Sequence, residues 1–221
     1  MKRVCLVGAT GLIGYSVIEE AVGRNDVRII GLARREIALP GGARMELLVA
    51  DTGGWAEAIA AANAEVLVCT LGTTIRRAGS EEAFRAVDHD LVLQCARAAR
   101  DAGIERMITV SSVGADTGRN FYLRTKGEVE TALGKCGFKR LDILRPGLLR
   151  GARAEHRPLE GLGQIVGPVA DLFLHGGMRQ YRSIRAATVA RAILTLTQQK
   201  VAGRFVHDFD AMQRILRRVG E

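Results

Sequence analysis

A tyrosine and a lysine, preceded by a pair of serines, have the residue types and spacing of proton-transfer chemistry. Ser111 and Ser112 directly follow an apolar run, and Tyr122 and Lys126 lie four residues apart in a helical pattern. Residues four apart share one face of a helix, so the phenol and the ammonium point the same way. A free phenol ionises near about pH 10, and a neighbouring ammonium makes it a better acid and base near neutrality. We therefore expect Tyr122 to protonate a carbonyl oxygen that receives hydride, with Lys126 as its partner and a serine hydroxyl steadying that oxygen.

A glycine-rich turn near the start of the chain has the features of a phosphate-binding site. Gly8, Gly11 and Gly14 follow an apolar run over residues 3–7 and precede a helical pattern over about 12–23. Glycines let the backbone approach a pyrophosphate, and the N–H groups at the helix start favour that anion. The spacing is GxxGxxG and differs from the common GxGxxG fingerprint. Its place between a strand and a helix makes a dinucleotide site the stronger interpretation than a plain tight turn.

The end of the second predicted strand indicates which dinucleotide binds. Arg34 follows the apolar run over residues 27–33, at the place where an NAD enzyme has an acidic residue. The guanidinium fork fits a phosphate, so we expect NADP(H) rather than NAD(H). Two alternatives remain open, namely that Arg34 and Arg35 are ordinary surface residues and that Glu36 binds the ribose.

Apolar strands alternate with helices along the whole chain. The pattern predicts further strands over about 45–50, 66–71, 107–110, 141–144, 181–184 and near 205, and helices over about 56–63, 80–102, 121–135, 187–199 and 210–219. Such alternation predicts a doubly wound, mostly parallel sheet covered on both faces, an α/β fold. We expect one domain over residues 1–221, with 151–180 as a small lid or substrate lobe. The apolar stretch over 159–174 is expected to roof the pocket or to form a homodimer contact.

Composition excludes several other classes of protein. The 221 residues are 48% hydrophobic and 25% charged, as in average soluble domains, and no apolar run is long enough for a membrane span. The net charge of +8 arises in residues 111–221, but no nucleic-acid motif accompanies it. The four cysteines lie far apart and are expected to be reduced, buried fillers, and no histidine spacing suggests a metal site. We expect a cytoplasmic protein, because glycines interrupt the apolar run after Lys2 and Arg3, unlike in a secretion signal.

These motifs together resemble an atypical short-chain dehydrogenase/reductase. The resemblance rests on the glycine-rich turn, Ser111-Ser112, Tyr122-x-x-x-Lys126 and Arg145-Pro146-Gly147. It is closer still to the oxidoreductase group named for the human HIV Tat-interacting protein, through Leu71-Gly72-Thr73-Thr74, Phe121-Tyr122-Leu123 and Lys126-Gly127-Glu128-Val129-Glu130. It covers residues 3–150 well and implies an NADP-binding Rossmann fold of about seven strands.

The resemblance also implies a role for each matching position. Ser112 is the implied catalytic serine, with Ser111 as the alternative, beside Tyr122 and Lys126. The implied cofactor contacts comprise pyrophosphate contacts (Gly8, Thr10, Gly11, Leu12, Ile13, Gly14), 2′-phosphate contacts (Arg34, Arg35), adenine contacts (Asp51, Thr52), ribose contacts (Leu71, Gly72, Thr73, Tyr122, Lys126) and nicotinamide contacts (Pro146, Gly147, Leu148).

The sequence departs from that family in the helix before the fifth strand. Many relatives have an Asn there as part of a proton relay, whereas this chain has Val87-Asp88-His89-Asp90. We expect reduction of a small carbonyl compound or the reverse oxidation, because the segment after residue 150 is too small for a nucleotide-sugar. The alternatives are a redox-sensing or scaffold protein that binds NADPH without turnover and, with little support, a nucleic-acid-binding module.

Overall fold

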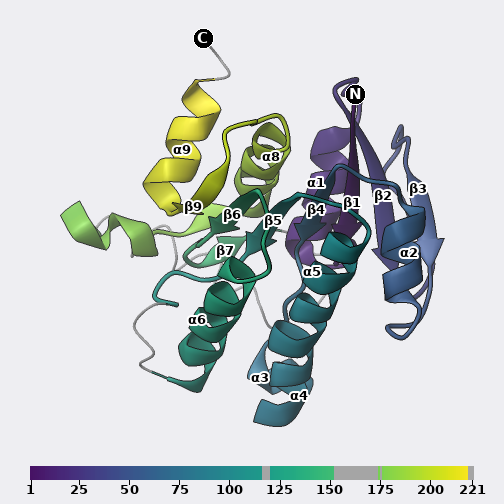
Figure 1. The fold of residues 1–221 in the computed structure, drawn as a ribbon. Helices are drawn as coiled ribbons and strands as arrows, with labels where there is room; N and C mark the ends of the chain where they lie inside the picture. Colours follow the sequence, from purple (N-terminus) through teal and green to yellow (C-terminus); the bar gives the residue numbers. More distant parts are fainter. Residues whose placement is uncertain (116–119, 152–173, 175, 219–221) are drawn as a thin grey trace.

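Seven parallel strands form the central sheet of the computed structural model, which describes residues 1–115, 120–151, 174 and 176–218 (Figure 1). Their order is β3-β2-β1-β4-β5-β6-β9. The bounds are β1 (Lys2–Val7), β2 (Val27–Ala33), β3 (Glu46–Val49), β4 (Val66–Cys69), β5 (Arg106–Val110), β6 (Arg140–Leu144) and β9 (Gly203–His207). β7 (Leu149–Arg150) and β8 (Ile184–Arg185) form a separate parallel pair. The expected doubly wound α/β fold is confirmed.

Helices cover both faces of the sheet. One face carries α2 (Trp55–Ala61), α5 (Val92–Asp101) and α6 (Phe121–Gly134), and the other carries α1 (Leu12–Ala21), α8 (Ala186–Leu196) and α9 (Phe209–Arg217). The shorter helices are α3 (Ile75–Ala78), α4 (Glu81–Arg85), the π-helical segment η1 (Ala86–Leu91) and the 3-10 helix η2 (Gly176–Tyr181).

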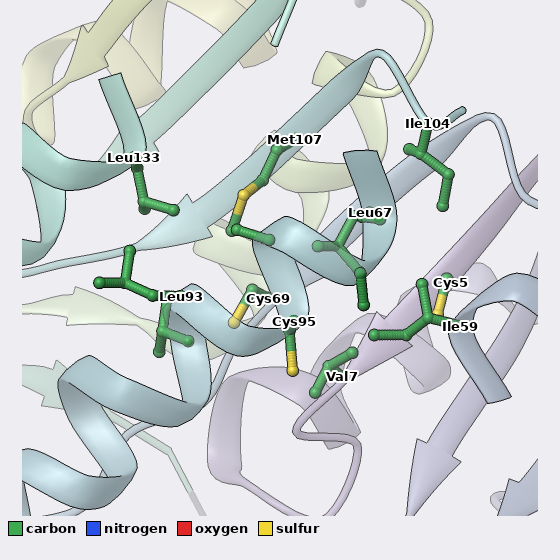
Figure 2. Packing of buried hydrophobic residues seen from close by; sticks show 14 of the residues in the cluster. Cys5, Val7, Ile59, Leu67, Cys69, Leu93, Cys95, Ile104, Met107 and Leu133 are labelled. Carbon is green, nitrogen blue, oxygen red and sulfur yellow. The ribbon is translucent and has the colours of Figure 1, made fainter. Parts of the chain in front are cut away.

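Two apolar layers hold these helices to the sheet, because the inner strands are buried on both faces. Val7 pairs with Cys69 across β1 and β4, and both side chains enter the layer under α2, α5 and α6. Figure 2 shows Leu67, Met107 and Leu133, which belong to this layer. The central strands are therefore held by apolar packing on both faces.

The helical pattern over residues 80–102 is not one helix. It consists of α4, η1 and α5, so a single turn of π-helix interrupts the α-helical hydrogen bonds. Ser80 starts it as expected, with its hydroxyl accepting the Ala83 N–H at 3.1 Å. A π-helical turn adds a residue and rotates the side chains that follow, which periodicity alone does not predict.

The region after β6 also differs from the expectation. The predicted strand over 181–184 is instead the end of η2 followed by β8, because a 3-10 turn runs through Tyr181. Most of the predicted lid over 151–180 lies outside the described residues, as does the apolar stretch over 159–174 except Leu174.

Candidate active site

The predicted site residues follow six neighbouring strands at the same edge of the sheet. Gly8 follows β1, Arg34 follows β2 and Leu71 lies two residues beyond β4. Asp51, Ser112 and Pro146 lie two residues beyond β3, β5 and β6. In a parallel sheet these carboxyl ends form one rim, and connections run outward in both directions from β1 and β4. The fold therefore brings the predicted residues to the crevice where doubly wound proteins bind ligands.

The glycine turn is required by close backbone contacts. Gly8 has φ +90°, and a Cβ on it would lie 2.8 Å from Oγ1 of Thr70. A Cβ on Gly14 would lie only 2.2 Å from the carbonyl oxygen of Gly8. The Thr70 hydroxyl donates to the carbonyls of Val7 at 3.0 Å and Gly8 at 3.2 Å, which fixes the turn to β4. Any side chain at Gly8 or Gly14 would push the turn away from the sheet.

The start of α1 offers unpaired backbone donors. Gly11 is the N-cap and makes no side-chain cap hydrogen bond, and Thr10 and Gly11 are exposed. Leu12 is half-buried, whereas the side chain of Ile13 lies in the apolar layer below, so Ile13 has only backbone atoms to offer. N–H groups at a helix start attract anions, so this turn fits the pyrophosphate of a dinucleotide.

The residues after β2 and β3 lie beside the glycine turn in the sheet order. Arg34, Arg35 and Glu36 are all exposed where β2 ends. Asp51 accepts the Gly54 N–H at 3.0 Å and so shapes the turn into α2, and the Thr52 carbonyl accepts the Gln94 amide at 3.2 Å. Arg34 and Arg35 have the charge and exposure to bind a phosphate, whereas Asp51 and Thr52 accept hydrogen bonds from within the protein.

Lys126 is buried in an ion pair that the sequence did not predict. Its ammonium lies 2.7 Å from Oδ1 of Asp88, with side chains 7% and 0% exposed, respectively. The other carboxylate oxygen of Asp88 accepts the Thr73 N–H at 2.7 Å. A Cβ on Gly72 would lie 3.6 Å from Asp88 Oδ1 and 4.0 Å from Lys126 Nζ, so the pair lies against the backbone of this loop. One carboxylate thus joins η1, α6 and the loop after β4.

Tyr122 lies one turn before Lys126 and is held by aromatic contacts. Its ring centroid is 5.4 Å from that of Phe84 on α4, and Phe84 also contacts Phe121 at 5.9 Å. Phe84 is fully buried and Tyr122 half-buried, so the phenol is fixed on one side and accessible on the other. Asn120 starts α6 by accepting the Leu123 N–H at 2.8 Å.

The two serines have different surroundings. The Ser111 hydroxyl donates to Glu130 Oε1 at 2.5 Å, and Arg145 binds both oxygens of the same buried carboxylate, with a shortest contact of 2.6 Å. Within the described residues, Ser112 makes only a long contact, 3.3 Å to the Val113 carbonyl. Ser111 is therefore engaged within the protein, and Ser112 has the hydroxyl that a substrate oxygen could use.

The loop after β6 closes this end of the rim. The Pro146 carbonyl accepts the Val113 N–H at 3.1 Å, which joins it to the serine loop. A Cβ on Gly147 would lie 2.5 Å from the Arg182 carbonyl oxygen, so only glycine fits there. Leu148 is exposed beside it.

A cavity of about 640 Å³ lies elsewhere, on the outer side of α6. Its lining includes Gly127, Glu128 and Thr131 together with Arg204 of β9. Helical periodicity places these α6 residues on the opposite side from Tyr122 and Lys126. Glu130 and Arg145, which surround Ser111, also line this cavity, so it borders the serine end of the rim and not the Tyr122 and Lys126 end.

Three buried cysteines lie beneath the rim and are protonated thiols at neutral pH. Burial raises the pKa of the Cys5 thiol to about 12 and that of Cys69 to about 11, and it also raises the pKa of Cys95. Within residues 1–115, 120–151, 174 and 176–218, no group of three or more His, Cys, Asp or Glu residues is placed to hold a metal ion.

A family of known proteins matches most of the chain. Residues 8–200 match a family described as NAD(P)H-binding. The chain belongs to this family. The match begins at Gly8, the first residue of the glycine turn, and it supports a nicotinamide cofactor at the rim without distinguishing NADP from NAD.

Curated relatives span nearly the whole chain. The fmp52 protein of Emericella nidulans, named mitochondrial, is 34% identical over 215 residues, 92% of each chain. FMP52 of Candida albicans, also named mitochondrial, is 32% identical over 206 residues, 90% of this chain and 89% of that protein. These relatives are Fmp52 proteins and are not named for the Tat-interacting protein.

Solved structures share the fold at low sequence identity. The enzyme WbmH of Bordetella bronchiseptica, solved with NAD+, has a TM-score of 0.71 at 14% identity, covering 97% of this chain and 78% of that chain. A UDP-N-acetylglucosamine 4-epimerase from Methanobrevibacter ruminantium has a TM-score of 0.67 at 15% identity, covering 94% and 76%. These structures share the Rossmann-type α/β fold with this chain.

The expected cytoplasmic location is wrong by the same comparison, because the relatives are named mitochondrial proteins. The prediction rested on the glycine-interrupted apolar run being a strand and turn. A strand and turn carry no information about the compartment. Among the described residues, no helix is both long and apolar enough to cross a membrane.

Proposed function

We propose that this protein is an NADP-dependent oxidoreductase of the short-chain dehydrogenase type that acts on a small carbonyl or alcohol substrate. The observation that carries the proposal is the buried Lys126, on the helix face that bears Tyr122 and against the loop that follows β4. Burying an ammonium raises the free energy of the folded protein, and such buried charges are commonly found at catalytic sites.

The rim residues divide among the parts of the cofactor. The glycine turn and the start of α1 would hold the pyrophosphate, and Arg34 with Arg35 the 2′-phosphate. The remaining contacts proposed are adenine at Asp51 and Thr52, ribose at Leu71, Gly72, Thr73 and Lys126, and the nicotinamide side at Pro146, Gly147 and Leu148. When bound, the cofactor supplies or accepts the hydride.

The chain's own residues handle the proton. Tyr122 would donate its phenolic proton to the substrate oxygen in reduction and take it back in oxidation. Lys126 has three N–H donors, and its ion pair with Asp88 leaves donors for ribose hydroxyls. Ser112, rather than Ser111, would hold the substrate oxygen, because Ser111 is engaged by Glu130. The motifs resemble those of the Tat-interacting protein group, and we propose a relationship to that group within the family.

Replacing Tyr122 with Phe tests the proposal. With NADPH and a panel of small aldehydes and ketones, turnover should fall by about 100-fold or more, the usual contribution of a positioned acid. NADPH affinity should stay within about twofold, and Tyr15→Phe in α1 is the matched control that should retain turnover.

Two results would contradict it. Unchanged turnover in Tyr122→Phe would exclude this phenol as the acid. NADPH binding by the wild-type protein without turnover of any substrate on the panel would favour the alternative of a redox-sensing or scaffold protein.

A further inference from the structure

The buried carboxylate of Asp88 has a place in the site that the proposed chemistry has not used. Its two oxygens bind two different parts of the rim, the Lys126 ammonium at 2.7 Å and the Thr73 N–H at 2.7 Å. Both contacts lie against the backbone of Gly72. The carboxylate is therefore within the electrostatic range of whatever Lys126 acts on.

Two acids of the π-helical turn η1 point in opposite directions. Asp88 is 1% exposed, whereas Asp90, two residues later, lies on the outside and pairs with His89 at 2.6 Å. Arg85 and Glu128 form a second exposed pair at 2.5 Å. Of these two acids, Asp88 is the one that contacts the buried Lys126 ammonium, since residues two apart lie on nearly opposite sides of a helix.

A buried ion pair has a different electrostatic effect from a lone buried ammonium. An isolated ammonium loses part of its hydration and tends to lose its proton, and a carboxylate at contact distance keeps it charged. The same carboxylate opposes the positive potential that the ammonium exerts on nearby groups. With Asp88 and Lys126 both charged, the pair has no net charge.

We propose that Asp88 is a positioning residue that holds the Lys126 ammonium against the loop after β4 and cancels part of the positive potential acting on the Tyr122 phenol. The inference rests on the proposed function in giving Tyr122 a proton to transfer. The charge arrangement itself needs no cofactor, so the two ideas fail separately.

The other titratable groups near this pair do not change its charge near neutrality. From β4, Cys69 faces Lys126 and Asp88, and burial holds its pKa near about 11, so the thiol is neutral. Arg85 and Glu128 form an exposed pair that water screens, and His89, whose side chain is 15% exposed, pairs with the exposed Asp90. Asp88 is thus the negative charge that contacts Lys126 at the buried end of this group.

An absorbance titration of the tyrosine phenols tests the proposal without any substrate. The chain has three tyrosines, and subtracting the titration of Tyr122→Phe isolates the signal of Tyr122. Asp88→Asn keeps an oxygen for the Thr73 N–H but removes the charge. Its Tyr122 should ionise at a lower pH than in the wild type, with about a tenfold larger phenolate-to-phenol ratio at a given pH.

Asp90→Asn is the matched control, because it makes the same chemical change on the exposed side of the same segment. It should leave the ionisation of Tyr122 unchanged. A Tyr122 that ionises in Asp88→Asn at the wild-type pH, or above it, would overturn the proposal, since a merely structural Asp88 would alter stability alone.

A second pair of variants applies if Asp88→Asn does not fold. Lys126→Met should raise the pH at which Tyr122 ionises, and the double variant Asp88→Asn/Lys126→Met should bring that pH back down. Equal values in the single and double variants would show that Asp88 does not act on Tyr122. Failure of the wild-type protein to bind NADPH would count against the proposed function and would leave this titration interpretable.

Discussion

Two buried charge clusters lie on different faces of the sheet and differ in how completely they are paired. Asp142 on β6 accepts Arg140 at 2.6 and 2.9 Å and His207 at 2.8 Å, and Arg140 also donates to the Val201 carbonyl. The Phe205 ring covers the Arg140 guanidinium at 4.4 Å. At the rim, by contrast, Asp88 is the one ion-pair partner of the Lys126 ammonium within the described residues.

This difference in pairing distinguishes a cluster that stabilises the fold from one that has groups available for function. In the Asp142 cluster the donors are directed at protein acceptors, so its charges join β6 to β9 and to the segment before β9. In the Asp88 cluster an ammonium with three donors meets one carboxylate beside an open loop. Burial of charge does not by itself indicate function, whereas a buried donor with spare hydrogen-bonding capacity at a strand end does.

The largest expected effect is a loss of stability when the Asp142 cluster is broken. Asp142→Ala leaves Arg140 and His207 buried without their carboxylate, and it should lower the free energy of unfolding by about 3–5 kcal/mol. Urea unfolding measures the loss, and NADPH titration of the folded fraction should give wild-type affinity. A folded Asp142→Ala protein with wild-type stability would show that the cluster is not the structural one.

The next effect concerns the exposed end of the rim. Arg34→Ala removes a charged donor to the 2′-phosphate and should weaken NADPH binding by about 10- to 100-fold, the equivalent of about 1.5–3 kcal/mol. NADH affinity and thermal stability should not change, because Arg34 is exposed. Arg217→Ala on α9 is the control. Equal losses for NADPH and NADH would mean that Arg34 acts on something other than the 2′-phosphate.

A smaller effect distinguishes two helix caps of the same kind. Asn120 caps α6 and Asp208 caps α9, each accepting a backbone N–H, at 2.8 and 2.7 Å. Replacing either with Ala should cost about 1 kcal/mol of stability. Only Asn120→Ala should also reduce turnover, since α6 carries Tyr122 and Lys126. Equal turnover in the two variants would remove the link between α6 and catalysis.

The smallest effect is on thiol chemistry at neutral pH. Raised pKa values of about 12 for Cys5 and about 11 for Cys69 keep these thiols protonated, and Cys95 behaves in the same way. Iodoacetamide at pH 7.5 should therefore label the half-buried Cys136 first, although partial burial raises its pKa as well. Labelling should rise with pH as thiolate forms. Rapid modification of Cys69 in the folded protein would show that the layer beneath the rim opens.

The sequence predicted the parallel sheet and the strand ends that carry the site better than it predicted which side chains pair with one another at those ends. Alternating apolar runs determine a parallel sheet, and parallel strands bring Gly8, Arg34 and Ser112 to one edge. Periodicity could not reveal η1, because a π-helical turn leaves the apolar pattern on both sides intact. No motif assigned Asp88 a role, and its pairing with Lys126 is seen only in the fold, which places Asp88 inside and Asp90 outside.

The choice between the serines shows the same limit. Ser111 and Ser112 are identical neighbours, and strand alternation points them to opposite sides. Which side matters depends on Glu130 and Arg145, whose positions come from the packing of α6 against the end of β6. The catalytic roles themselves remain predictions.

Calorimetric titration of the wild-type protein with NADPH and, separately, with NADH tests the central claim most directly. The account predicts one NADPH bound per chain, with clearly weaker binding of NADH. Binding of neither nucleotide would contradict the assignment of the glycine turn and the rim to a dinucleotide. Equal or tighter binding of NADH would contradict the role of Arg34.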